Sequence, residues 1–239
     1  MTIPVLSDLE LLEMQIEALF THDDRGRIVT VNEPGGGPAP RFFFGRAREG
    51  KLWRVRHDLP SDMAQRLESL ATREAVTDDL KAAPHNLDAM LAVLAKDGEA
   101  RVGHAGPAYR FPDHLPAPTG VTRITVANAH LLRRMPAYLD DVKRGLDAYE
   151  PRLAVIEDGV AVAICNSARL TNRVAEAGVE TLEGYRGRGY ATAVVATWAL
   201  AIRETGRIPL YSTSWDNLAS RAVARKLGLV QYGTDLNLW

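Results

Sequence analysis

The sequence predicts an α+β or α/β fold in two parts: a smaller α+β domain over residues 1–117, and a helix-flanked mixed sheet over residues 118–239. The boundary follows from residues 111–120, where three prolines exclude both a helix and a central strand. Beyond them, strand-like and helix-like apolar periodicities follow one another as strand, helices, three strands, helix, strand, helix, strand. That order is typical of helices packed on a sheet.

In the second part, period-two or β-branched runs predict strands at residues 122–127, 152–157, 160–170, 177–182, 208–212 and 229–236. Helical spacing predicts helices over residues 130–149, broken near Pro136, over residues 191–202 and over residues 217–227. Asp158-Gly159 is a strong hairpin signal between the second and third strands.

The first part has weaker signals. Leu9, Leu12, Ile16 and Leu19 recur at helical spacing and predict an amphipathic helix. A strand at residues 27–31, a hairpin over 41–57, helices over 61–74 and 86–96, and a strand near 108–111 follow.

Composition excludes several classes of protein. The formal net charge is −1, which gives no electrostatic reason to expect nucleic acid or an anionic membrane as a partner. Cys165 is the only cysteine, so neither an internal disulfide nor a thiolate-rich metal site is expected, and the histidines lack metal-ligand spacing. The N-terminus carries acids where a secretory signal carries Lys or Arg, and no apolar run is long enough to span a membrane. We therefore expect a soluble cytoplasmic protein.

The chemically informative segment is ETLEGYRGRGYAT, residues 180–192, where a predicted strand runs into a predicted helix. The first N–H groups of a helix lack internal partners and carry partial positive charge. Glycines let such a backbone bend around an anion, and Arg186 and Arg188 add charge. The turn therefore suits a phosphate or pyrophosphate. As a bare pattern, an ordinary tight turn is an equally good interpretation.

RGRGYA, residues 186–191, resembles the R/Q-x-x-G-x-G/A pyrophosphate loop of the GNAT superfamily of N-acetyltransferases. The neighbouring strands and helices, together with Asn217-x-x-Ser220 and the following KLG, residues 226–228, occur in the family's order and spacing. The resemblance covers about the last half of the chain. It implies a mostly antiparallel sheet that splays open beside the 177–182 strand and holds acetyl-CoA in the cleft.

The resemblance also implies roles for individual residues. The main chain of Val179 and Thr181 is expected to pair with the pantetheine arm, and Asn217 and Ser220 to contact the CoA arm or anchor its turn. The pyrophosphate is expected to bind Arg186 and the amides of Gly187, Arg188, Gly189, Tyr190 and Ala191.

The expected chemistry is direct attack of a primary amine on the thioester. An alkylamine is mostly protonated at neutral pH, so a base must accept its proton. The candidate bases are Glu176, Glu180 and Glu183. Glu176 and Glu180 are an even number of residues apart, so they lie on one face of the strand. Glu183 can also be explained as an ordinary turn residue.

Many family members protonate the leaving thiolate with a Tyr seven residues after the Asn. This chain has Ala224 at that position. The proton donor to the thiolate is then Tyr211, Tyr232 or water, or the thiolate leaves without being protonated.

The sequence thus predicts an acetyl-CoA-dependent N-acetyltransferase acting on a small-molecule or peptide amine, with no metal and with a homodimer as the expected assembly. The alternative is a catalytically silent CoA-binding regulatory module. The first 117 residues are either a degenerate copy of the same fold or an accessory layer that closes the acceptor site. The acceptor itself has no signature in the sequence.

Overall fold

The computed structural model describes residues 6–239, which fold into two compact units. Unit 1 contains the described residues up to Tyr109 together with Ser212–Leu218 and Gln231–Trp239, and unit 2 contains Arg110–Tyr211 and Ala219–Val230. The first crossing between the units lies close to the proline-rich segment. The prediction placed one boundary after residue 117. In the structure the chain returns to unit 1 for its last strand, so the two units are not two continuous halves of the sequence.

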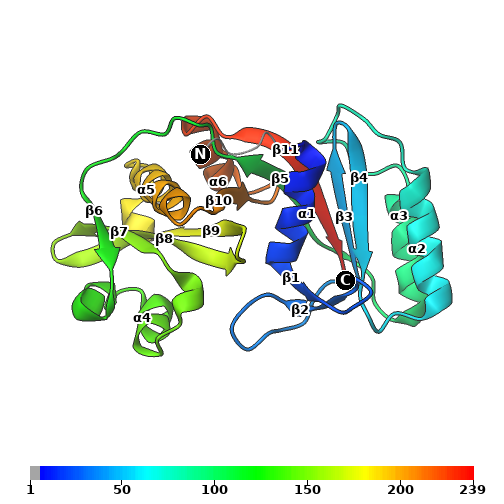
Figure 1. Ribbon diagram of the computed structural model, residues 1–239, viewed down its shortest axis with the longest axis horizontal. Coiled ribbons are helices and arrows are strands. Elements are labelled where there is room, and N and C mark those ends of the chain that lie inside the picture. Colours follow the sequence, from blue (N-terminus) through cyan, green and yellow to red (C-terminus); the bar gives the residue numbers. More distant parts are fainter. Residues whose placement is uncertain (1–5) are drawn as a thin grey trace. The chain divides into compact units, whose positions relative to one another are not determined.

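Unit 1 is a four-stranded sheet with helices on both faces (Figure 1). Its elements are α1 (Asp8–Leu19), β1 (Phe20–His22), β2 (Ile28–Val31), β3 (Phe42–Ala47), β4 (Gly50–Val55), α2 (Ser61–Arg73), α3 (Leu87–Leu94), β5 (Val102–Arg110) and β11 (Val230–Leu238). The strand order is β4-β3-β11-β5, and β11 runs antiparallel to β3 with Leu236 opposite Phe44. The C-terminal strand thus completes the sheet of unit 1. The periodicity argument missed the short β1 and expected β5 only from residue 108, whereas the strand begins at Val102.

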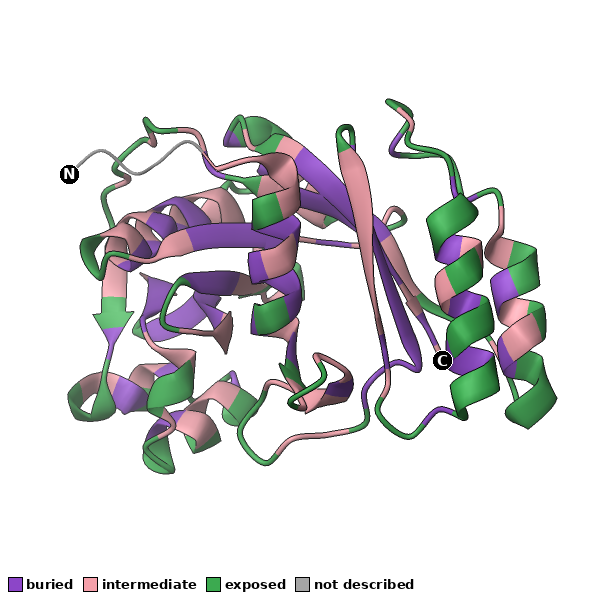
Figure 2. Cartoon of the chain, turned by 45° about the vertical axis from the view of Figure 1, so that its right-hand side comes forward, coloured by how far each residue is buried: buried purple, intermediate pink, exposed green. Residues whose placement is uncertain are grey.

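The run Phe42-Phe43-Phe44 shows how this sheet buries both of its faces. Successive side chains of a strand point to opposite sides. Phe42 and Phe44 accordingly join the apolar cluster under α2 and α3, whereas Phe43 joins Ile16 of α1 in a second cluster. Figure 2 shows α2 and α3 with buried residues on one side and exposed residues on the other.

Unit 2 contains the strands and helices predicted for residues 122–227, but the predicted helix over 130–149 is an α-helix only from Pro136 to Lys143 and is 3-10 on either side. Its elements are β6 (Val121–Ile124), the 3-10 segment η2 (Val126–Leu132), α4 (Pro136–Lys143), β7 (Arg152–Glu157), β8 (Val160–Leu170), β9 (Val174–Thr181), the 3-10 turn η4 (Glu183–Tyr185), α5 (Tyr190–Glu204), β10 (Ile208–Ser212) and α6 (Leu218–Lys226). The strand order is β10-β9-β8-β7-β6, antiparallel except for the parallel pair β9–β10. The expected mixed, mostly antiparallel sheet flanked by helices is confirmed.

Two local predictions in unit 2 are confirmed for the reasons given. Asp158 and Gly159, between β7 and β8, have φ angles of 49° and 70°, and two consecutive positive φ values are what a two-residue hairpin turn requires. Pro136 is the first residue of α4, where its missing N–H costs nothing because that group has no partner within the helix.

The core of unit 2 forms on both faces of its sheet. α5 packs against β7, β8 and β9 and buries Trp198 completely. The other face carries a cluster that includes Leu132, Met135 and Ile164, with Tyr138 of α4 packed against it. Within residues 6–239, no helix is long and apolar enough to cross a membrane, and no group of three His, Cys, Asp or Glu side chains gathers as a metal site.

Trp198→Phe is expected to lower the free energy of unfolding by about 1–2 kcal/mol. The substitution leaves a cavity and removes the 3.2 Å hydrogen bond that the indole Nε1 donates to Ser167 Oγ in the core. Urea unfolding followed by circular dichroism measures the change. Trp53→Phe on β4, where the side chain is only half-buried, is the matched control and should cost less. Equal losses in the two variants would contradict the buried role of Trp198.

Candidate functional site

The sheet of unit 2 opens along one side of β9. In the described part of the chain, β10 pairs with β9 only where residues 208–210 lie opposite residues 174–176. β8, on the other side, pairs with β9 as far as Thr181. The N–H and C=O groups of residues 177–181 that point away from β8 therefore face no residue of β10 in this register. An extended ligand with amide groups can pair with such an edge. The main chain of Val179 and Thr181, the predicted pantetheine contacts, belongs to this segment.

The loop after β9 exposes the start of α5. Gly187 and Gly189 have φ angles of 80° and 85°, a region that strains residues with a Cβ atom. Gly189 is the N-cap of α5, and no side chain caps this helix start. An added Cβ at either glycine would meet nothing within 4 Å. The glycines are therefore required here by their backbone conformation, while the space beside the first amides of α5, including those of Tyr190 and Ala191, is open.

The side chains of the loop are held by its own backbone and by β7. Arg186 Nε donates to Thr181 O at 3.3 Å, and Arg188 Nη2 donates to Gly184 O at 3.2 Å. The Tyr190 hydroxyl donates to Glu157 Oε1 at 2.6 Å, and this bond raises the pKa of Tyr190 above its ordinary value. Tyr190 can therefore offer a ligand its main-chain N–H while its hydroxyl is occupied.

A third arginine, absent from the sequence-based site, reaches the same loop from the turn between η2 and α4. The Arg134 guanidinium lies 5.6 Å from the ring centre of Tyr185, and its Nη1 lies 3.4 Å from the Tyr185 hydroxyl. The Arg188 guanidinium lies 5.1 Å from the same ring. Arg134, Arg186 and Arg188 thus add positive charge around a helix start that is itself positive. Nothing in the sequence pattern could have identified Arg134, because 51 residues separate it from Tyr185.

The two predicted bases lie in different environments. Glu180 is exposed near the end of β9, opposite Ile164 of β8. Burial and the Glu180 charge raise the pKa of Tyr138 well above its ordinary value, so this hydroxyl stays protonated. Glu176 is only 3% exposed and lies where β9 is still paired with β10. Glu180 therefore lies on the open segment of β9, and Glu176 lies in the closed one.

Two of the predicted site residues, Tyr211 and Ser220, are joined by a hydrogen bond. Tyr211, at the end of β10, is 1% exposed, and its hydroxyl lies 2.6 Å from Ser220 Oγ in α6. Tyr232 belongs to unit 1 and donates its hydroxyl to Gln15 Oε1 at 3.0 Å. Ala224, which stands where many family members have Tyr, is buried at 1% exposure. Of the two tyrosines considered as proton donors, only Tyr211 lies in unit 2.

Asn217 is exposed and precedes the first residue of α6. Its backbone N–H donates to Ser214 O at 3.2 Å. A position before a helix start is favourable for a polar side chain. Its expected contact with the CoA arm stays a prediction.

The single cysteine, Cys165, is not a nucleophile candidate. Cys165 on β8 is fully buried, and burial raises the pKa of its thiol well above the ordinary value. A reactive cysteine needs a stabilised, accessible thiolate. Cys165 is therefore a small residue of the core.

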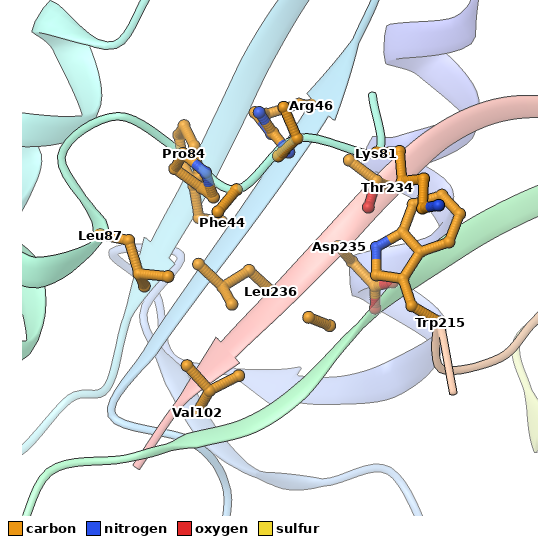
Figure 3. A pocket seen from close by; sticks show the side chains of 13 residues that line it. Phe44, Arg46, Lys81, Pro84, Leu87, Val102, Trp215, Thr234, Asp235 and Leu236 are labelled. Atoms are coloured by element: carbon orange, nitrogen blue, oxygen red, sulfur yellow. The ribbon is translucent and has the colours of Figure 1, made fainter. Parts of the chain in front are cut away.

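A separate cavity of about 120 Å³ lies in unit 1 (Figure 3). Its walls are mostly apolar, and its polar lining comes from side chains such as Arg46, Thr234 and Asp235. Arg46 Nη2 donates to Ala82 O at 2.5 Å and Thr234 Oγ1 to Gly106 O at 2.6 Å, so both groups are occupied by main-chain carbonyls. None of the residues predicted for catalysis or cofactor binding lines this cavity.

A family model described as GNAT acetyltransferase matches residues 153–234. Those residues belong to the GNAT family. The match takes in β7 to β10, the glycine loop, α5, α6 and the first part of β11, and no curated protein sequence matches the chain. The GNAT segment thus includes the open edge of β9 and the exposed start of α5.

Solved structures of GNAT proteins resemble this chain. The GCN5-related N-acetyltransferase of Kribbella flavida is 20% identical over 99% of this chain and 96% of that chain, with a TM-score of 0.51. The GNAT-family acetyltransferase of Colwellia psychrerythraea is 14% identical over 78% and 75%, with a TM-score of 0.49. A GNAT-family protein of Novosphingobium aromaticivorans is 20% identical over 58% and 66%, with a TM-score of 0.45. The likeness to the Kribbella protein concerns the fold and extends over both units.

Proposed function

We propose that the chain is an acetyl-CoA-dependent N-acetyltransferase that transfers an acetyl group to a primary amine by direct attack on the thioester. The observation that carries the proposal is the juxtaposition, in unit 2, of the edge of β9 over residues 177–181, which β10 does not pair, with an exposed helix start at Gly189. A strand edge suits the amides of pantetheine, and a helix start suits a diphosphate. CoA carries both groups in one molecule.

The residues present fit this cofactor. The first amides of α5 have no side-chain cap, and the space at Gly187 and Gly189 is open. Arg134, Arg186 and Arg188 supply positive charge, and Glu157, the carboxylate that contacts the loop through Tyr190, already accepts a hydrogen bond. A diphosphate at this place would gain charge-assisted hydrogen bonds from both the backbone and the arginines.

Bound acetyl-CoA supplies the acetyl group as a reactive thioester. Glu180 accepts the proton of the acceptor ammonium, because it is the glutamate on the open segment of β9 and carboxylates are effective general bases when close to the reacting group. A main-chain N–H of the same segment donates to the oxygen on which negative charge develops, which is the kind of fixed donor that stabilises such a charge most.

Tyr211 is the residue that we propose as proton donor to the departing thiolate. Its hydroxyl lies in unit 2 beside Ser220 Oγ, and either of these two hydroxyls can donate to the other. A phenolate left on Tyr211 can therefore accept a hydrogen bond from the Ser220 hydroxyl until it regains a proton from solvent. The buried Ala224 has no ionisable group, so it cannot take this role.

Isothermal titration with CoA, and release of free thiol from acetyl-CoA in the presence of an amine panel, test the proposal together. Tight CoA binding with amine-dependent thiol release supports it. Ala224 in place of a tyrosine favours a second candidate, a catalytically silent CoA-binding regulatory module. Tight binding of CoA with no turnover of any amine would establish that second function, and absence of CoA binding would exclude both.

Arg134→Ala is expected to weaken CoA binding by about 3- to 10-fold, because it removes one partly screened charge beside the loop. Titration calorimetry at low and moderate salt measures the effect, which should shrink as salt rises. Arg144→Ala, an exposed arginine just after α4, is the matched control and should leave the affinity unchanged. Equal affinities of wild type and Arg134→Ala at low salt would remove Arg134 from the site.

A further inference from the structure

A buried arginine without an acidic partner lies in the wall of the unit 1 cavity. Arg46 on β3 is 6% exposed. Burial lowers the pKa of its guanidinium, and the charges of more distant carboxylates offset this only in part. The group stays charged, yet within residues 6–239 it forms no ion pair. Because a buried charge with no opposite charge beside it is costly, Arg46 is a cation to which an anion can add stability.

Arg46 also has N–H groups that no atom of residues 6–239 accepts. Both of its hydrogen bonds come from Nη2, which donates to the main-chain oxygens of Leu80 and Ala82, so the N–H groups of Nε and Nη1 are left over. Arg46 lies on the same strand face as Phe44, because residues two apart on a strand point to the same side. Both residues line the cavity (Figure 3). The remaining donors of the guanidinium are therefore available to a molecule in the cavity.

The acid in the cavity wall has a different partner. Asp235 stands opposite Gly45, and a Cβ at Gly45 would meet a leucine of α1, so this pair belongs to the α1 side of the sheet. Asp235 Oδ1 lies 3.4 Å from His104 Nε2, which turns the carboxylate away from Arg46. Lys81, whose side chain is exposed where it lines the cavity, adds a second positive charge. The charges around the cavity therefore favour an anion.

The rest of the cavity limits the size and the kind of that anion. Its volume is about 120 Å³. An apolar cavity of about 150 Å³ holds benzene, so this one suits about five non-hydrogen atoms. Its apolar walls come from Phe44, Pro84, Leu87, Val102, Trp215 and Leu236. Phosphate, which carries no hydrocarbon, gains nothing from such walls, whereas a carboxylate on a short hydrocarbon body does.

We propose that the unit 1 cavity binds a small carboxylic acid with a short aliphatic body. The carboxylate accepts a charge-assisted hydrogen bond from the free N–H groups of Arg46, and the hydrocarbon packs against Phe44, Leu87 and Leu236. None of the residues predicted for catalysis or cofactor binding lines the cavity, so this binding site does not depend on the proposed acetyl transfer.

Methyl spectra of the full chain test the site directly. The methyl groups of Val102 and Leu236, labelled with 13C and assigned through Val102→Ile and Leu236→Met, are followed during titration with isobutyrate. We expect saturable shifts with a dissociation constant in the millimolar range, because so few atoms contribute little binding energy. Isobutyramide has the same shape without the charge, and it should bind about 10-fold more weakly.

Two variants separate the cation from the cavity. Arg46→Met removes the charge and should weaken isobutyrate binding by about 10-fold, with much less effect on isobutyramide. Arg66→Met makes the same change at an exposed residue of α2, and this matched control should bind like wild type. Arg46 also holds the main chain at residues 80–82, so a second variant guards against misfolding. Ala105→Leu fills the cavity, keeps Arg46 and should abolish the shifts.

The contrary results are equally specific. Equal affinities of wild type for isobutyrate and isobutyramide would show that Arg46 does not act as an anion site. Inorganic phosphate that binds as tightly as isobutyrate would show that the apolar walls contribute nothing. No shifts at tens of millimolar isobutyrate, or unchanged shifts in a folded Ala105→Leu protein, would mean that Arg46 only ties down the 80–82 segment. Each of these results would overturn the proposal, and none bears on CoA binding, which is titrated separately.

Discussion

Gly189→Glu is expected to weaken CoA binding by about 100-fold without unfolding the protein. Gly189 is the N-cap of α5 with φ at 85°, and its Cβ position opens onto empty space beside the first amides of the helix. A glutamate there brings a negative charge to the place proposed for the diphosphate. Two unit charges roughly 5 Å apart repel by about 3 kcal/mol at an effective dielectric constant of 20, and salt reduces this.

Two control variants separate charge from backbone strain. Gly189→Ala carries the strain of a left-handed residue, about 1–2 kcal/mol, without the charge, so it should lower stability while weakening CoA binding much less. Gly206→Glu repeats the same substitution at the opposite end of α5, where φ is 78° and the space is also open. It should leave CoA affinity unchanged. Titration calorimetry gives all three affinities, and a Gly189→Glu protein that binds CoA like wild type would remove the loop from the site.

The elements of unit 2 could be predicted because each is encoded by a local pattern. Val160–Leu170 is apolar and β-branched and forms β8, while the stripe that includes Val194, Trp198 and Ile202 has helical spacing and is buried in α5. The loop could be predicted for the same reason, since Gly187 and Gly189 do adopt the positive φ that the anion-loop argument needs.

The features that the sequence did not reveal all depend on long-range contacts. β11 follows α6 in the chain, yet it joins unit 1 because its partner is β3, and strand pairing of this range has no local signal. Arg134 lies just before α4 and is an ordinary helix-segment residue by pattern. Its place beside the loop arises from Tyr185, which lies 51 positions further along the chain. Side-chain partners of this kind require the fold to be known first.

Glu180→Gln is expected to lower kcat by about 10²- to 10⁴-fold, the range that a general base contributes. The amide keeps the shape of the side chain, but it cannot take the ammonium proton. CoA affinity should be unchanged, because the first amides of α5 and the loop arginines are untouched.

Glu176→Gln is the matched comparison, because it makes the same change on the same strand face at the place where β9 is still paired with β10. Its effect should fall on stability more than on kcat, as the side chain is buried. Free-thiol release from acetyl-CoA at saturating amine gives kcat, and urea unfolding gives stability. If Glu176→Gln loses kcat and Glu180→Gln keeps it, the base is the buried glutamate, and the open edge of β9 serves only to bind the cofactor.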